Sequence, residues 1–418
     1  MTTPGTIVQK GFRKKQVVLP VLREAYASAL IEWFRQHDYA CTVGQTRIVL
    51  AREFGFCYGV DRAIQYAYET RIQFPDRRIF LTGEVIHNPF VNRRLQEQGI
   101  AFLPVSPDGA KDYSVIQPDD VVIIPAFGVT VEEFQAIRAR GCIIVDTTCG
   151  SVMNVWKSVR RYAREGFTSV IHGKYWHEET RATASQAMAL GGHYLIVLSR
   201  AEAEVVATYI RDGGDRQAFL ERFRAAVSPG FDPDRHLERI GLANQTTMLM
   251  NESLEIQEIL RAAMRDRYGP EQLAARFRAF DTICSATQDR QDAVIELLAQ
   301  HDVDLMIVIG GFNSSNTGSL LRICQQYCPS YHIESASSIL SARAIHHKPY
   351  MAEPRVTEHW LPRGRITIGV TAGASTPNRV VAEVILRLLE VRGESLARAP
   401  FRAILLQGDV SHGERASE

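Results

Sequence analysis

Three of the seven cysteines in this 418-residue chain occupy the same place in three similar segments. Cys57, Cys149 and Cys284 each follow a predicted strand and come directly before a predicted helix. The positive end of a helix dipole favours a thiolate at the helix N-terminus, and thiolates are the ligands of soft metals and iron–sulfur clusters. The pattern therefore predicts a set of three thiolate ligands. Three thiolates on a [4Fe–4S] cluster leave one iron open to a substrate.

The segments that follow these cysteines also repeat. Each continues with a predicted helix, a strand and a polar loop, and Gly83, Gly173 and Gly310 come 26, 24 and 26 positions after their cysteines. Alternating strands and helices of this length predict parallel sheets with right-handed crossovers. Chance alternation in an ordinary α/β chain is the simpler explanation, but it does not account for cysteine, glycine and loop recurring in register. We expect an α/β fold of three pseudo-threefold-related units, a trefoil around a central iron–sulfur cluster.

The repeat also predicts the organisation of the chain. The strand at residues 47–51 is expected to pair with the last unit, and residues 23–35 have the apolar spacing of a helix. Residues 211–236 resemble an insertion or long loop in the second unit. The predicted divisions are an N-terminal extension at 1–45, α/β units at 46–147, 148–282 and 283–395, and a polar C-terminal tail at 396–418.

The other four cysteines are interpreted as structural. Cys142 lies in an apolar predicted strand, and Cys41 lies shortly before the first strand of the repeat. Cys324 and Cys328 stand four apart on a predicted helix, so they could share a metal ion. A buried helix face is the favoured interpretation, because free cysteine packs as a small hydrophobic residue.

Composition excludes several classes of protein. The chain is 45% hydrophobic, which is ordinary for a globular protein, and its formal net charge of +1 implies no broad basic surface for nucleic acid. No apolar run approaches the roughly 20 residues of a membrane span. The basic N-terminus lacks the apolar core of a signal peptide, and an odd number of scattered cysteines argues against a disulfide framework. We expect a cytoplasmic protein that binds neither nucleic acid nor membrane.

Several longer motifs occur in a fixed order between residues 47 and 391. They are G-F-C-Y-G-V-D-R-A, V-I-H-N-P-F-V, D-T-T-C, I-H-G-K-Y-W-H-E-E-T-R-A-T-A-S, Q-T-T, F-N-S-S-N-T and G-V-T-A-G-A-S-T-P. This series closely resembles the LytB-type family of 4-hydroxy-3-methylbut-2-enyl diphosphate reductases. The P-A-F-G and H-G-K-Y-W-H-E-E-T forms resemble the plant and cyanobacterial branch of that family.

The resemblance implies a reductive dehydroxylation. Two electrons and two protons would convert (E)-4-hydroxy-3-methylbut-2-enyl diphosphate to isopentenyl and dimethylallyl diphosphates plus water, the last step of the methylerythritol phosphate route. One [4Fe–4S] cluster per chain would be held by Cys57, Cys149 and Cys284. The electron donor would be ferredoxin or flavodoxin.

The resemblance also assigns the other site residues. Glu179 would be the general acid, which the reaction needs because hydroxide is a poor leaving group, and Thr246 would order the proton relay. Without the motif, Glu178 and Glu179 would simply be acids at a helix N-terminus. The side chains that would bind the diphosphate are His87, His177, Ser314, Ser315, Asn316 and Ser375. Without the motif, each histidine would be interpreted as structural and the S-S-N run as a helix N-cap.

The sequence departs from the common bacterial pattern at two positions. Phe127 stands where many members carry a phosphate-side histidine, so Lys174 or another group would have to compensate, and Gly150 stands where proline is usual. Two other functions remain open. One is a different enzyme with an open iron, such as a dehydratase or a quinolinate-synthase-like protein. The other is a non-catalytic cluster or zinc protein, although such sites normally have four ligands.

Overall fold

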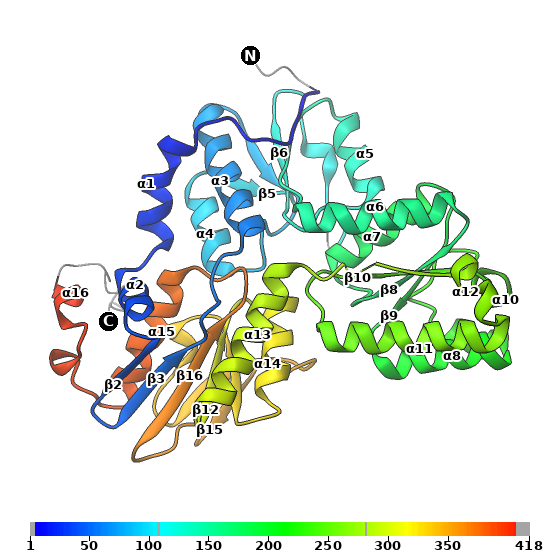
Figure 1. The fold of residues 1–418 in the computed structure, drawn as a ribbon. Coiled ribbons are helices and arrows are strands. Elements are labelled where there is room, and N and C mark those ends of the chain that lie inside the picture. The colour runs from blue at the N-terminus through cyan, green and yellow to red at the C-terminus, as the bar shows by residue number, and fades with distance from the viewer. Residues whose placement is uncertain (1–4, 107–108, 281, 407–418) are drawn as a thin grey trace. The chain divides into compact units, whose positions relative to one another are not determined.

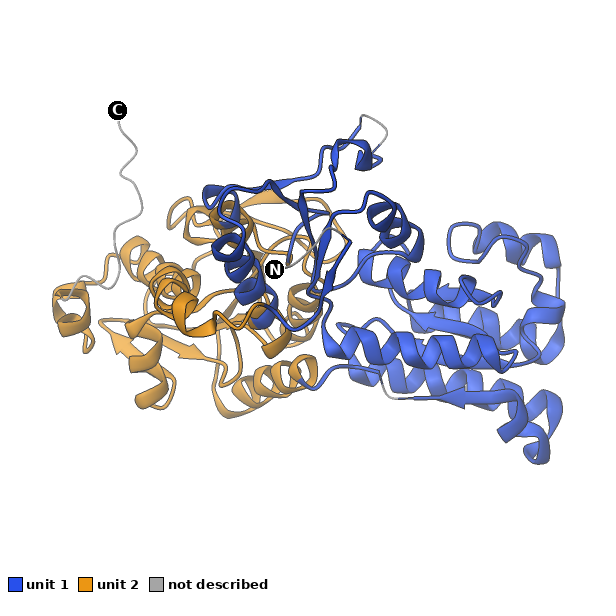
Figure 2. Ribbon diagram, turned by 90° about the horizontal axis from the view of Figure 1, so that it is seen from above, with its two compact units in different colours: residues 1–11, 62–85, 95–285 blue, residues 12–61, 86–94, 286–418 orange. Residues whose placement is uncertain are grey.

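The computed structural model describes residues 5–106, 109–280 and 282–406 (Figure 1). In this part of the chain there are three sheets of mainly parallel strands with helices around them, and one separate antiparallel pair of strands. The chain divides into two compact units (Figure 2). Unit 1 comprises residues 1–11, 62–85 and 95–285, and unit 2 comprises residues 12–61, 86–94 and 286–418. No helix within the described residues is long and apolar enough to cross a membrane.

The first sheet belongs to unit 1 and has the strand order β1-β7-β6-β4-β5, with every pairing parallel. Every residue of β4 and β6 is buried, as expected for apolar parallel strands that are covered on both faces. The strands are β1 (Ile7–Val8), β4 (Ile79–Leu81), β5 (Ile100–Phe102), β6 (Val121–Ile124) and β7 (Ile143–Asp146). The helices in this part of the chain are α3 (Tyr58–Gln73), α4 (Pro89–Glu97), α5 (Val131–Ala139) and the 3-10 turn η1 (Tyr113–Val115).

The second sheet, also in unit 1, has the order β11-β10-β8-β9 and is parallel throughout. Successive residues of a strand face opposite sides. Leu242 of β10 packs in a core with α8 and α11, whereas Ala243 packs with α6 and Phe167, so helices cover both faces. The strands are β8 (Thr168–His172), β9 (Tyr194–Val197), β10 (Ile240–Asn244) and β11 (Phe277–Ala279). The helices are α6 (Gly150–Arg164), α7 (Glu178–Met188), α8 (Arg200–Asp212), α9 (Arg216–Arg222), α10 (Pro233–His236), α11 (Met250–Tyr268) and α12 (Pro270–Arg276).

The third sheet belongs to unit 2 and has the order β13-β12-β16-β3-β2, in which only β2 runs antiparallel to its neighbour. Phe34 of α2 and Leu388 of α15 share one buried core with Ile48 and Val370 of the sheet. The strands are β2 (Ala40–Val43), β3 (Thr46–Leu50), β12 (Leu305–Ile309), β13 (Ser330–Ile333) and β16 (Ile366–Ala372), with the separate pair β14 (Ala344–His347) and β15 (Arg355–Glu358). The helices are α1 (Lys15–Tyr26), α2 (Ala29–Gln36), α13 (Ser285–Gln300), α14 (Ser315–Cys324), α15 (Asn378–Val391), α16 (Arg402–Leu406), η2 (Ala336–Ser338) and η3 (Leu396–Arg398).

The predicted α/β class with parallel sheets is confirmed. The early strand β3 pairs in parallel with β16, so the expected pairing of residues 47–51 with the last repeated segment is also confirmed. The predicted boundaries of the extension, the three units and the tail stay a prediction. Residues 407–418 of the predicted tail lie outside the described residues.

Three local predictions are wrong. The helix expected over 23–35 is two helices, because Ala27 is extended and the Ser28 hydroxyl caps α2 by accepting from the Ile31 N–H. Cys324 is the last residue of α14, so Cys328 is not on the same helix. Residues 211–236, expected as an insertion or long loop, contain two helices, α9 and α10, each capped by an aspartate, so the loop interpretation is wrong and the insertion stays a prediction.

Candidate active site

Each of the three repeated cysteines sits at the start of a helix and is fixed by the same backbone contact. The helices α3, α6 and α13 begin directly after Cys57, Cys149 and Cys284. The three cysteine N–H groups donate to carbonyl oxygens in a loop after a strand of the preceding predicted copy, those of Ala374 (3.1 Å), Ala126 (2.8 Å) and Thr246 (3.3 Å) respectively, and for Cys57 the copy concerned is the last one. This recurring contact supports the repeat, because equivalent loops are joined in all three cases.

The seven cysteines differ in how deeply they are buried. None of the seven cysteines forms a disulfide in the part of the chain that the structure describes, and the three repeated ones and Cys328 are half-buried, whereas Cys41, Cys142 and Cys324 are buried. Burial raises the pKa of both Cys41 and Cys142 to about 11, and burial also raises the pKa of Cys324 and Cys328. A thiol with a raised pKa is a poor thiolate ligand at neutral pH. Burial therefore argues against a soft-metal group at Cys41, Cys142, Cys324 and Cys328.

The two residues expected to move a proton lie together in unit 1. The Thr246 N–H donates to Glu179 Oε1 at 2.6 Å, and the Thr246 hydroxyl donates to Glu179 Oε2 at 3.0 Å. Both side chains are buried, Glu179 with 3% and Thr246 with 5% of its surface exposed. Because the Thr246 carbonyl also accepts from the Cys284 N–H, this pair is tied directly to a repeated cysteine. Glu178, in contrast, is exposed.

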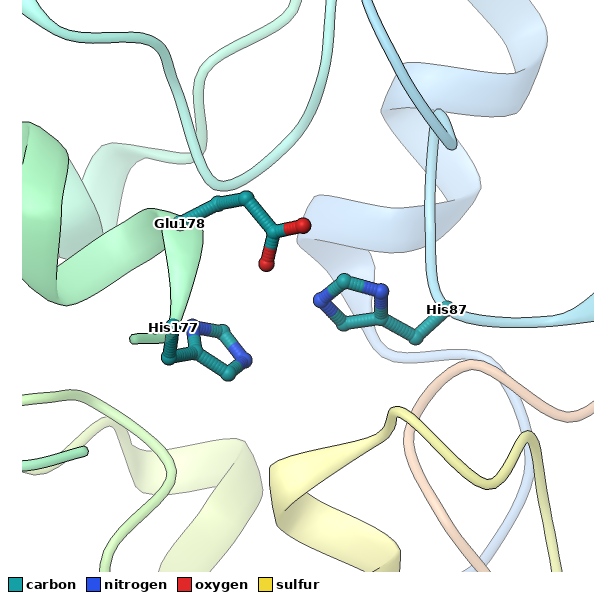
Figure 3. Close-up of side chains that lie close together, drawn as sticks. All are labelled: His87, His177 and Glu178. Atoms are coloured by element: carbon teal, nitrogen blue, oxygen red, sulfur yellow. The ribbon is translucent and has the colours of Figure 1, made fainter. Parts of the chain in front are cut away.

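His177 caps the helix that carries the acid. It is the N-cap of α7, and its Nδ1 accepts from the Glu179 N–H at 3.2 Å, so in the neutral ring the proton is on Nε2. Phe127 lies edge-to-face with the His177 ring at a centroid distance of 6.3 Å. Phe127 therefore packs against a predicted phosphate-side histidine. Figure 3 shows His177 and Glu178 at the start of α7 and His87 in the loop before α4.

Gln245 is a positioning residue that sequence reasoning did not assign, although it belongs to the Q-T-T motif. Its Oε1 accepts from the Lys174 N–H at 3.1 Å and from the Thr180 hydroxyl at 3.0 Å, and its Nε2 donates to the Thr247 hydroxyl at 2.8 Å. These bonds fasten the loop between β8 and α7 to the end of β10. Gly173 is required there, since a Cβ atom would lie 2.8 Å from the Thr180 hydroxyl. The sequence feature that could have indicated this role is the position of Gln245 directly before Thr246 and Thr247.

The S-S-N run forms the beginning of α14 in unit 2. Ser314 is the N-cap, and its hydroxyl accepts from the Thr317 N–H at 3.2 Å and the Thr317 hydroxyl at 2.9 Å. Ser315 is only 2% exposed, and no group among the described residues forms a hydrogen bond with its hydroxyl. Asn316 uses its Oδ1 to accept from the Ala374 N–H at 2.9 Å. A helix N-terminus with a buried hydroxyl of this kind is suited to an anion.

His87 and Ser375 also lie together in unit 2. The Ser375 hydroxyl donates to the His87 carbonyl oxygen at 3.1 Å. Gly311 permits the close approach of this loop, because a Cβ atom at that position would lie 2.4 Å from the same oxygen. Nearby, the buried guanidinium of Arg290 donates to the Gly55 carbonyl at 2.6 Å and so holds the segment before Cys57.

The predicted site residues thus fall into two groups, one in each unit. The group in unit 1 has the chemistry for proton transfer and consists of Cys149, Cys284, His177, Glu179 and Thr246. The group in unit 2 surrounds a helix N-terminus and consists of Cys57, His87, Ser314, Ser315, Asn316 and Ser375.

Fold and site residues define an α/β protein with three equivalent helix-terminal thiols, a buried carboxylate–hydroxyl pair and a helix N-terminus suited to an anion. The sequence model of the LytB protein family matches residues 48–389. The chain belongs to the LytB family.

Two relatives from cyanobacteria are similar over almost their full length, as the predicted branch requires. A protein of Thermosynechococcus vestitus named 4-hydroxy-3-methylbut-2-enyl diphosphate reductase is 51% identical, with 92% of this chain and 94% of the relative covered. A protein of the same name from Nostoc sp. is 50% identical, with the same coverage of 92% and 94%. The solved structure of E-1-hydroxy-2-methyl-but-2-enyl-4-diphosphate reductase from Plasmodium falciparum shares the fold, with a TM-score of 0.58 and 20% identity over 82% of this chain and 87% of that one.

Proposed function

We propose that this chain is an oxidoreductase that removes the hydroxyl group of (E)-4-hydroxy-3-methylbut-2-enyl diphosphate. The C–O bond breaks and a C–H bond forms, so two electrons and two protons give isopentenyl or dimethylallyl diphosphate and one water. Membership of the LytB family and the names of its cyanobacterial relatives support the reaction. The observation in the structure that carries the proposal is the buried Glu179–Thr246 pair, since departure of the hydroxyl as water needs a proton donor.

The protein's own part in the reaction begins with proton delivery. Glu179 holds the proton, and the two hydrogen bonds from Thr246 fix the orientation of its carboxyl group. The Thr246 hydroxyl can turn to accept from Glu179 while it donates to the substrate hydroxyl, because one hydroxyl both donates and accepts. A side chain held in position in a water-excluded site transfers its proton without first reorganising.

The diphosphate is assigned to the beginning of α14. Its backbone N–H groups and helix dipole attract an anion, and the buried Ser315 hydroxyl supplies a further donor. Ser314, Asn316, Ser375 and His87 of unit 2 are proposed to complete this pocket, and His177 of unit 1 is proposed as a further residue that binds the substrate. In unit 2, Asn316 and Ser375 also hold neighbouring loops together, so they position backbone as well as contact substrate.

The residues proposed to hold the cofactor are Cys57, Cys149 and Cys284, with one [4Fe–4S] cluster per chain. When bound, such a cluster supplies electrons and a Lewis-acidic iron for the substrate oxygen. The three half-buried thiols fit this role, as do their positions at helix N-termini. Ferredoxin or flavodoxin is the proposed electron donor.

Anaerobic purification followed by reductive turnover tests the proposal. The protein is expected to contain four iron and four sulfide per chain, as the cluster formula requires, and to reduce the diphosphate alcohol with reduced methyl viologen. Replacement of Cys57, Cys149 or Cys284 by serine should abolish the visible absorption of the cluster or make it unstable. Cys328→Ser is the matched control, because Cys328 is likewise half-buried and forms no disulfide. Equal loss of the cluster in the control would refute the ligand assignment, and absence of turnover by the wild-type protein would refute the function.

A further inference from the structure

The helix that begins after Cys149 has a continuous exposed face. The buried side of α6 packs Val152, Val155, Val159 and Tyr162 into unit 1. The opposite side is exposed at helical spacing from the first turn to the last. This face is formed by Gly150, Asn154, Lys157, Arg161 and Arg164, with Arg160 also exposed beside it. At 1.5 Å per residue the face is about 21 Å long.

The charge of α6 distinguishes it from the two equivalent helices. It contains one lysine and three arginines and has no acidic residue. The helix α3, which follows Cys57, has two arginines and two acidic residues, and α13, which follows Cys284, has one arginine and three acidic residues. The positive face is therefore not a consequence of placing a cysteine at a helix N-terminus. It is specific to the helix after Cys149.

Neighbouring groups extend this positive charge. Arg161 donates to Glu165 at 3.0 Å, and Arg278 lies 3.3 Å from the other oxygen of the same carboxylate. The pKa of Glu165 is lowered, first by the hydrogen bond from Arg161 and then by the charges of Arg278, Arg161 and Arg239. One acidic residue is thus shared by three arginines, and cations remain in excess around this end of α6.

At the other end of the face, the exposed backbone of Gly150 lies beside Cys149, a proposed cluster ligand. Gly150 is exposed, and a Cβ atom added there would meet no atom within 4 Å among the described residues. A partner seated on this face could therefore approach Cys149 without displacing a side chain at position 150. A nucleic acid would also match the positive charge, but it carries no redox centre that has to come close to Cys149.

We propose that this α6 face is the docking surface for the electron donor, a small acidic protein that carries a one-electron centre. The inference rests on the proposed function and adds where the donor binds. Lys157, Arg161 and Arg164 attract the acidic surface of the donor, which increases the rate of encounter and fixes its orientation. The open Gly150 backbone then lets the redox centre of the donor come close to Cys149.

Charge reversal on α6 tests the docking surface. The double variant Lys157→Glu/Arg161→Glu is compared with Arg261→Glu/Arg265→Glu on α11, whose arginines are each 48% exposed and have acidic neighbours. Turnover of the diphosphate alcohol is measured with reduced plant-type ferredoxin and, separately, with reduced methyl viologen, which is too small to need a docking surface. We expect the α6 variant to lose about 10-fold or more in kcat/KM for ferredoxin, mainly through a higher KM. Its turnover with methyl viologen should stay within about twofold of wild type, as steering acts on encounter with the protein donor.

The salt dependence gives a second readout. Turnover of the wild-type protein with ferredoxin should fall as ionic strength rises, and the α6 variant should lose most of this dependence, whereas the α11 variant should keep it. Equal effects of the two double variants, or unchanged kinetics with ferredoxin in the α6 variant, would overturn the proposal. Binding of a DNA duplex to the α6 face in preference to ferredoxin would also overturn it. Failure of the wild-type protein to act with methyl viologen would instead refute the proposed function. Should the α6 variant not fold, Lys157→Gln tests the same surface with a single neutral change.

Discussion

Replacing Glu179 by glutamine separates proton transfer from structure. Glutamine has the shape of glutamate and keeps an oxygen that can accept from the Thr246 N–H, now 2.6 Å from Oε1. Its amide nitrogen would face the Thr246 hydroxyl, 3.0 Å from the present Oε2, and the hydroxyl can accept from it after rotation. The buried hydrogen bonds are therefore preserved, but the acidic proton is lost.

The expected effects on stability and on turnover differ in size. Both hydrogen bonds keep a partner in the glutamine variant, so the expected cost to stability is at most about 1 kcal/mol each, the net contribution of an ordinary hydrogen bond. Loss of a general acid lowers turnover by about 100-fold or more. That factor corresponds to about 2.7 kcal/mol in the activation barrier. The variant should thus remain folded and bind the diphosphate, yet be nearly inactive.

The assay follows turnover, substrate binding and cluster absorption in the same anaerobic preparation. Glu178→Gln is the matched control, because it makes the same chemical change one residue earlier at an exposed position. Turnover of Glu179→Gln close to that of the wild type, or an equal loss in Glu178→Gln, would show that the proton comes from elsewhere.

Three further substitutions test the surroundings of the two groups. Ser315→Ala should weaken binding of the diphosphate by about 10-fold or more, measured by calorimetry, because a lost hydrogen bond to a charged group costs about 1.5–3 kcal/mol; unchanged affinity would exclude Ser315 from the pocket. Gly173→Ala should destabilise the protein by about 1–3 kcal/mol through overpacking, since its Cβ would lie 3.0 Å from Cβ of Gln245, and thermal unfolding with an unchanged midpoint would contradict this. Gly128→Ala should lower the free energy of unfolding by about 2–4 kcal/mol, from a left-handed backbone and overpacking together. Gly128 has φ +80°, and a Cβ atom there would lie 2.5 Å from the Trp156 ring. Chemical denaturation measures the loss, and a stability equal to that of the wild type would refute the contact.

Sequence reasoning found the elements and the repeat because these depend on local pattern. The junctions at Cys57, Cys149 and Cys284 are marked by a change from strand-like to helix-like periodicity, and the structure starts a helix directly after each one. The pairing of β3 with β16 followed from the same register. The break at Ser28 was missed because apolar spacing continues across it, although serine is a favoured N-cap.

The site residues required more than local pattern. Glu179 and Thr246 are 67 positions apart, so no spacing rule joins them, and only the family resemblance placed them in one role before the structure showed their hydrogen bonds. Gln245 was passed over because its bonds to Lys174 and Thr180 cross between loops. The packing of Phe127 on His177 was likewise beyond a sequence argument, since it depends on the arrangement of two separate loops.

The repeated backbone contact explains how equivalent loops can carry different side chains around the three cysteines. In each case the cysteine N–H is bonded to the carbonyl of a strand-end loop, at Ala374, Ala126 or Thr246, so this contact does not require a particular side chain in the loop. The side chains of those loops are then free to differ. The loop at Thr246 orients the acid, the loop at Ala374 is held by Asn316 at the beginning of α14, and the loop at Ala126 packs Phe127 against a histidine. The helix after Cys149, unlike the two equivalent helices, carries basic residues and no acidic residue.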